Sequence, residues 1–153
     1  MKVLGIDPGV ERVGWGLVDS TGSRVEYISC GCIMTSKTLS QQERLASIAT
    51  QLAALIAREA PERAVVEKLF FSKNKKTALA VSEARGVILV ALRQAGINTT
   101  EYTPSEVKSA LAGNGRAEKR QVAWVVKNIL KIKEHIRSDD ALDALALALM
   151  VAK

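Results

Sequence analysis

The sequence predicts an α/β fold, a mixed five-stranded sheet with helices on both of its faces. Apolar segments near the start of the chain are joined by short turns, which predicts three strands paired antiparallel. Further along, short apolar segments alternate with stretches of helical periodicity, which predicts strands added in parallel through helical crossovers. The chain has 153 residues and no repeat or long linker, so we expect residues 1–153 to form a single domain.

The first three strands are predicted at 2–7, 13–19 and 24–34. The first is apolar throughout and ends at Asp7, just before Pro8 and Gly9, which is typical of a buried central strand. The turn signal Asp19-Ser20-Thr21-Gly22 connects the second strand to the third.

A first helix is predicted to begin after Ser40, because Ser40 and Glu43 match a capping box, and to end before Pro61. A helix of this length can cross the sheet, so the short apolar strand at 64–67 is predicted to lie parallel to the first strand. Asp7 and Glu67 would then lie side by side, at the carboxyl ends of two central strands.

The second half of the chain is predicted to be mostly helical. A helix at 77–94 stops at Gly96, and a strand follows at 97–102. Thr103 and Glu106 form a second capping box, which opens a helix that is broken at 113–115. The last two helices are predicted at 117–131, with Val122, Val125, Val126 and Ile129 inward, and at 139–152. Trp15 and Trp124 are predicted to lie in the core.

Composition and charge narrow the classes of partner. The apolar run at 144–152 is too short to span a bilayer, and no signal peptide is recognisable at the N-terminus. Cys30 and Cys32 are expected to be reduced thiols, which favours the cytoplasm.

The net charge is +6, and the excess of basic residues lies in one cluster near 73–76 and another between 108 and 137. Two separate basic regions favour a polyanion partner, most simply a nucleic acid.

Four carboxylates occupy unusual positions. Asp7 and Glu67 end strands that are otherwise apolar, and Asp143 lies in a helix that is apolar on nearly all sides. Asp140 precedes Asp143 by one helical turn on the same face, where two like charges repel unless a cation lies between them. Three of the acids have an ordinary alternative explanation: a turn cap for Asp7, an exposed strand tip for Glu67, and the helix dipole for Asp140. The helix dipole does not explain Asp143, which lies beyond the first turn.

Such a carboxylate cluster suits hard divalent cations such as Mg²⁺, which prefer oxygen ligands. Two such ions, about 3.5–4 Å apart, can activate a water and stabilise the leaving oxygen of a phosphodiester. Together with the basic surface, the four acids predict a metal-dependent nuclease in which water attacks phosphorus without a covalent intermediate.

Several segments carry a resemblance, in this order along the chain: Gly5-Ile6-Asp7-Pro8-Gly9, Val66-Glu67-Lys68-Leu69-Phe70, Ala84-Arg85-Gly86-Val87, Val107-Lys108, Ala117-Glu118-Lys119 and Asp140-Ala141-Leu142-Asp143-Ala144-Leu145-Ala146. In order and spacing they resemble the RuvC family of Holliday junction resolvases, within the ribonuclease H-like superfamily. Members of this family are dimeric endonucleases that nick two opposed strands of a four-way DNA junction with Mg²⁺ or Mn²⁺.

The resemblance implies roles for individual residues. Asp7, Glu67, Asp140 and Asp143 would be the catalytic metal ligands, with two ions per site. Lys108 and Lys119 would contact DNA, and Phe70 would meet a base near the crossover. The basic side chains near these residues are further candidates for DNA binding: Lys73, Lys75, Lys76, Arg116 and Arg120. The homodimer would be built mainly through the helix at 77–94, and the RuvA–RuvB branch-migration complex is a possible partner.

Some alternatives stay open in the sequence. Asp139 competes with Asp140 as the first helix ligand, and Phe71 competes with Phe70 for stacking on a base. A related ribonuclease H-like nuclease could act on RNA or on another branched DNA. An ATP-binding fold of the actin and hexokinase type also opens with a strand ending in aspartate, and a non-catalytic junction-binding module would share the basic surface.

Overall fold

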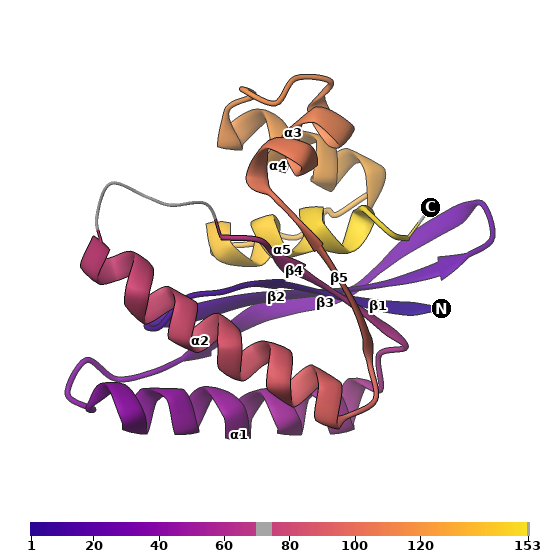
Figure 1. The fold of residues 1–153 in the computed structure, drawn as a ribbon. Coiled ribbons are helices and arrows are strands. Elements are labelled where there is room, and N and C mark those ends of the chain that lie inside the picture. The colour runs from indigo at the N-terminus through magenta and orange to yellow at the C-terminus, as the bar shows by residue number, and fades with distance from the viewer. Residues whose placement is uncertain (70–74, 153) are drawn as a thin grey trace.

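The computed structural model describes residues 1–69 and 75–152, except for the side chains of residues 75 and 76. In chain order the elements are β1 (Lys2–Asp7), β2 (Arg12–Thr21), β3 (Arg24–Met34), α1 (Gln41–Glu59), β4 (Arg63–Glu67), α2 (Lys75–Gln94), β5 (Asn98–Tyr102), α3 (Pro104–Ala112), α4 (Lys119–Ile129) and α5 (Asp139–Leu149) (Figure 1).

The strands form one five-stranded sheet in the order β3-β2-β1-β4-β5. β1, β2 and β3 pair antiparallel, whereas β4 pairs parallel with β1 and β5 parallel with β4. The predicted mixed sheet is therefore confirmed, with β1 at its centre. Both predicted capping boxes are present, at Ser40 with Glu43 and at Thr103 with Glu106.

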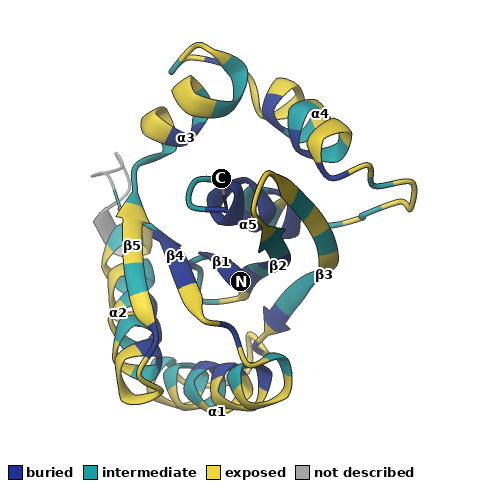
Figure 2. Ribbon diagram, turned by 90° about the vertical axis from the view of Figure 1, so that its right-hand side faces the viewer, coloured by how far each residue is buried: buried dark blue, intermediate teal, exposed yellow. Residues whose placement is uncertain are grey.

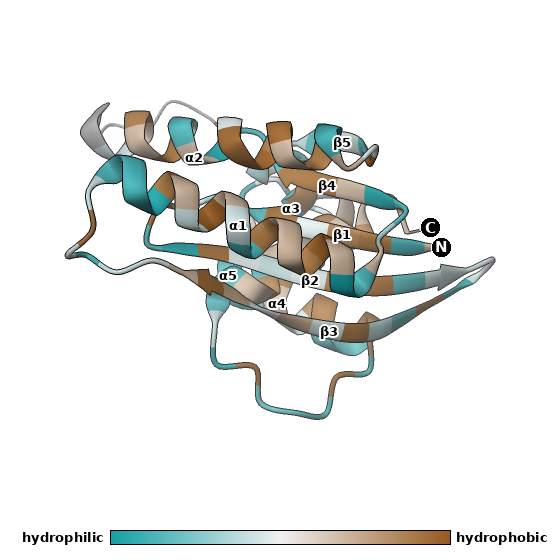
Figure 3. Ribbon diagram, turned by 90° about the horizontal axis from the view of Figure 1, so that it is seen from below, coloured by the Kyte–Doolittle hydropathy of each residue, from teal (hydrophilic) through white to brown (hydrophobic). Residues whose placement is uncertain are grey.

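Helices cover both faces of the sheet (Figures 1 and 3). Alternation along β1 sends Leu4 and Ile6 toward α1 and α2, and sends Val3 toward the opposite face, where α5 lies. The helices α3 and α4 pack beyond α5 and form an outer layer (Figure 2). Among the described residues, no helix is long and apolar enough to cross a membrane.

Glycines let α5 lie directly on the strands. A Cβ added to Gly5 would lie 1.8 Å from the carbonyl oxygen of Ala144, and one added to Gly16 would lie 2.6 Å from Cγ of Leu145. Gly5 and Gly16 are paired across β1 and β2, so the two bare positions form one shallow channel for the helix. The buried α5 therefore approaches the sheet with its backbone at Gly5 and with the side chain of Leu145 at Gly16.

The sequence prediction was wrong about two apolar residues of α4. Trp124 is 67% exposed and Ile129 is 44% exposed, whereas Val122 and Val126 are buried as predicted. Trp124 lies on the side of α4 opposite the two buried valines, which face α5 and the rest of the core. Trp15, in contrast, is partly buried and packs against the core beside α1.

Candidate active site

Asp7 and Glu67 are brought together by the pairing of β1 with β4. The register places Ile6 beside Val66, so the next residue of each strand, Asp7 and Glu67, follows at the same edge of the sheet. Both acids lie on the face that α5 covers, because they are two residues beyond Gly5 and Val65. On the α2 side, Arg85 Nε donates to the carbonyl oxygen of Glu67 at 3.2 Å and holds the end of β4.

The other two acids come from the first turns of α5. Ser138 caps this helix by accepting a hydrogen bond from the backbone N–H of Ala141 at 3.3 Å. A Cβ at Gly14, the residue paired with Asp7 across β2, would lie 2.1 Å from the carbonyl oxygen of Asp140. The start of α5 therefore lies against the strand next to Asp7.

Basic side chains pair with both acids of α5. Lys119 Nζ donates to Asp143 Oδ2 at 2.8 Å, and Arg12 Nε lies 3.2 Å from Asp140 Oδ2. Asp139 is exposed, and Asp140 is one of the carboxylates that act on Asp7. These contacts favour Asp140 over Asp139 as a member of the site.

Burial and neighbouring carboxylates disfavour the charged forms of Asp7 and Glu67. The pKa of Asp7 is raised to about 8, mainly by burial and then by the carboxylate of Glu67. Asp143 and Asp140 also raise this pKa, while Lys119 lowers it. Burial and then Asp143 raise the pKa of Glu67, with Lys119 opposing them. A positive charge nearby would therefore favour the ionised forms of Asp7 and Glu67.

The donor set fits a hard divalent cation, because it offers several carboxylate oxygens whose mutual repulsion a cation would relieve. In the described part of the chain, no three acidic, histidine or cysteine side chains already converge as a ready metal site. Arg12 and Lys119 instead neutralise the two acids of α5.

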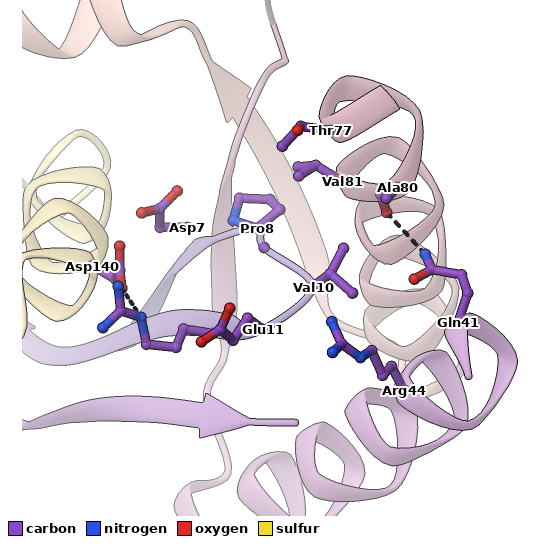
Figure 4. Close-up of a pocket in the computed structure, with 12 residues that line it drawn as sticks. Asp7, Pro8, Val10, Glu11, Gln41, Arg44, Thr77, Ala80, Val81 and Asp140 are labelled. Carbon is purple, nitrogen blue, oxygen red and sulfur yellow. Dashed lines mark hydrogen bonds and ion pairs between the residues drawn. The ribbon is translucent and has the colours of Figure 1, made fainter. Parts of the chain in front are cut away.

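Two hollows flank Asp7. The first, of about 260 Å³, lies between the sheet edge and the helices α3, α4 and α5. It is lined by Asp7, Glu67, Pro104, Val107, Lys108, Lys119, Val122, Asp143, Ala146 and Leu147. The second, of about 510 Å³, lies on the other side of Asp7, between the turn after β1 and the first turns of α1 and α2 (Figure 4).

The predicted DNA-binding residues fall into three groups. Lys108 and Lys119 line the smaller hollow beside the acids. Arg116 is exposed before α4, and Arg120 is 84% exposed and lies 2.6 Å from a carboxylate oxygen of Glu118. Lys75 and Lys76 begin α2, whereas Phe70, Phe71 and Lys73 lie outside the described residues.

Arg12 and Arg44 were missed in the sequence, although both line the larger hollow with Asp7. The sequence could have indicated Arg12, because the turn at Pro8 and Gly9 returns the chain alongside Asp7. It could not have indicated Arg44, since the position of Arg44 at the hollow depends on how α1 packs.

The model of the family "Crossover junction endodeoxyribonuclease RuvC" matches residues 3–151. This chain belongs to the RuvC family. It is 47% identical to the crossover junction endodeoxyribonuclease RuvC of Roseiflexus sp. (strain RS-1), over 97% of this chain and 88% of that protein. The predicted family resemblance is thereby confirmed.

Solved RuvC structures share the fold. The structure of Thermus thermophilus RuvC superposes with a TM-score of 0.89 at 37% identity, covering 99% of this chain and 93% of that chain. A structure of T. thermophilus RuvC in complex with a Holliday junction substrate gives a TM-score of 0.92 at 38% identity, with the same coverage of both chains. The predicted fold class is confirmed, and the RuvC family match decides against the ATP-binding alternative.

Proposed function

We propose that this chain resolves four-way DNA junctions by hydrolysing one phosphodiester bond in each of two opposed strands. The observation that carries the proposal is the gathering of four carboxylates at one end of β1, β4 and α5, beside two lysines, in a member of the RuvC family. The T. thermophilus relative whose structure contains a Holliday junction substrate has the same fold at 38% identity.

Asp7, Glu67, Asp140 and Asp143 are the proposed metal ligands and catalytic residues. Two divalent cations, Mg²⁺ or Mn²⁺, would supply polarisation of the phosphoryl oxygens and activation of the attacking water. The raised pKa values of Asp7 and Glu67 support this assignment, because a bound cation would favour the ionised forms that burial disfavours.

The lysines of the smaller hollow are proposed to bind the substrate backbone. Lys108 and Lys119 line it together with Asp7 and Glu67, so a phosphate held by the two ammonium groups lies beside the acids. Lys119 is 70% exposed while it pairs with Asp143, and it is therefore accessible to DNA. Phe70 or Phe71 is proposed to stack on an unpaired base near the crossover.

A homodimer is part of the proposal, because a two-fold enzyme matches the two equivalent strands of a junction. The helix α2 offers exposed apolar side chains for it, Leu79 at 65% and Val90 at 55% exposure. The proposal also includes a single nuclease domain over residues 1–153. It further includes a cytoplasmic location and cooperation with the RuvA–RuvB complex. The free thiols of Cys30 and Cys32 suit a reducing compartment.

The test is cleavage of an end-labelled four-way junction and of a linear duplex of matching sequence, each with EDTA, Mg²⁺ or Mn²⁺. Paired symmetric nicks in the junction alone, and only with metal, are expected. Equal cutting of the duplex would leave a nuclease of another specificity, and tight binding without cutting would leave a junction-binding module.

Two matched variants test the site assignment. Asp140→Asn is expected to abolish cleavage while junction binding persists, because it removes a proposed ligand and a repelling charge. Asp139→Asn, at the exposed neighbouring position, is expected to cleave like the wild type. The reverse result would move the ligand to Asp139.

A further inference from the structure

The larger hollow beside Asp7 has no role in the mechanism above. Its volume is about 510 Å³, and Asp7 and Asp140 form one of its walls. The turn after β1 forms its floor, and Arg44 of α1 points into it from the opposite side (Figure 4). Asp7 also lines the smaller hollow, so the two spaces meet at the catalytic end of β1.

Arg44 is the unexplained side chain of this hollow. Its Nε is buried and has no hydrogen-bond partner among residues 1–69 and 75–152. The neighbouring polar groups already have partners: Arg12 pairs with Asp140, and Glu11 lies 3.5 Å from Lys37. Protein atoms cover this nitrogen, so a ligand in the hollow can meet the guanidinium only through its terminal nitrogens. No carboxylate among the described residues forms an ion pair with Arg44 that would compete for them.

The chemistry of the acceptor follows from the side chain. The two terminal nitrogens of a guanidinium also lie side by side, which matches two oxygens of a phosphate. The first turns of α1 and α2, which contribute Gln41 and Thr77 to the lining, add the positive ends of two helix dipoles. These groups favour an anion on the Arg44 side of the hollow, while Asp7, Glu11 and Asp140 line the rest of it.

We propose that this hollow is a phosphate subsite for the strand being cut, with Arg44 as its main contact. The proposal rests on the proposed function. A strand whose scissile phosphate lies over Asp7, with one neighbouring phosphate at Lys108 and Lys119, places phosphates of its other side toward Arg44. The strand is then gripped on both sides of the bond that breaks, which fixes its direction across the site.

Phosphate neutralisation tests the subsite. A series of four-way junctions would each carry one uncharged methylphosphonate in place of a phosphate near the crossover. Binding of wild type and of Arg44→Ala would be measured in EDTA, and cleavage rates in Mg²⁺. In the wild type, a methylphosphonate at one position is expected to weaken binding by about tenfold to a hundredfold, which is the loss typical of a missing charged hydrogen bond. In Arg44→Ala the same junction should bind like the unmodified one.

Controls separate this subsite from a structural role of Arg44. Arg44→Lys keeps the charge but not the paired donors, and is expected to retain part of the sensitivity at that one position. Arg24→Ala changes an exposed arginine at the far end of the sheet and should keep the full wild-type pattern. A variant that merely misfolds would lose affinity for every junction equally.

Each outcome decides the matter. Sensitivity at no position in the wild type, or the same sensitivity in Arg44→Ala, overturns the subsite. If the wild type cleaves nothing while the coupling appears in binding, the nuclease proposal fails and the phosphate subsite stands. If cleavage is normal and no coupling is found, only the subsite fails.

Discussion

Replacing Asp7 by asparagine removes a carboxyl whose charged form is disfavoured where it lies. Its pKa is raised from 3.8 to about 8, first by burial and then by Glu67. At about 1.36 kcal/mol per pKa unit, this shift corresponds to an upper limit of roughly 5–6 kcal/mol. Partial exposure of the carboxyl screens its charge, so we expect Asp7→Asn to raise the free energy of unfolding by about 1–3 kcal/mol at pH 8 in EDTA.

The dependence on pH has a definite sign. Between pH 3.8 and about 8 the native state keeps a proton on Asp7 that the unfolded chain has lost, so wild-type stability falls as pH rises through this window. The advantage of Asp7→Asn is therefore expected to be near zero at pH 4, to grow with pH and to level off above pH 8. Urea unfolding at several pH values in EDTA measures it.

Adding Mg²⁺ should make the wild type more stable than Asp7→Asn. Mg²⁺ in the millimolar range is expected to raise the unfolding temperature of the wild type at pH 8, because it binds the native carboxylates. Asp7→Asn should gain less and should not cleave the junction. The reasoning is refuted if Asp7→Asn is less stable than the wild type in EDTA at pH 8, or if their difference does not change with pH.

Three further predictions concern packing and DNA binding. Gly5→Ala places a Cβ 1.8 Å from the carbonyl oxygen of Ala144, so it should lower the free energy of unfolding by at least about 1–3 kcal/mol; unchanged urea unfolding would contradict this contact. Lys119→Gln should weaken junction binding and reduce the slope of log affinity against log salt by about 1, and an identical slope would remove Lys119 from the phosphate contacts. Trp124→Ala should change the free energy of unfolding by no more than about 0.5 kcal/mol, since Trp124 is 67% exposed, and a loss of several kcal/mol would show that it packs.

Much of the fold could be predicted because its signals are local. The capping boxes at Ser40 and Thr103 fixed two helix starts, and the apolar run that ends in Asp7 identified the central strand. The juxtaposition of Asp7 and Glu67 followed from topology alone, since parallel neighbours end at the same edge.

What could not be predicted depends on how the helices pack. Trp124 and Val122 are both apolar residues of α4, and only the packing of α4 on α5 decides which of them faces water. The approach of Arg44 to the hollow beside Asp7 depends likewise on where α1 crosses the sheet. The distribution of charged residues along the sequence does not predict such contacts.

The glycines beneath α5 make the geometry of the proposed catalytic site depend on residues without functional side chains. The carbonyl oxygens of Ala144 and Asp140 rest over Gly5 and Gly14, so main-chain atoms set how far the helix acids lie from Asp7. In a screen for inactive variants, substitutions at these strand glycines should be found beside those of the proposed catalytic acids, although a glycine has no side chain that could act in catalysis.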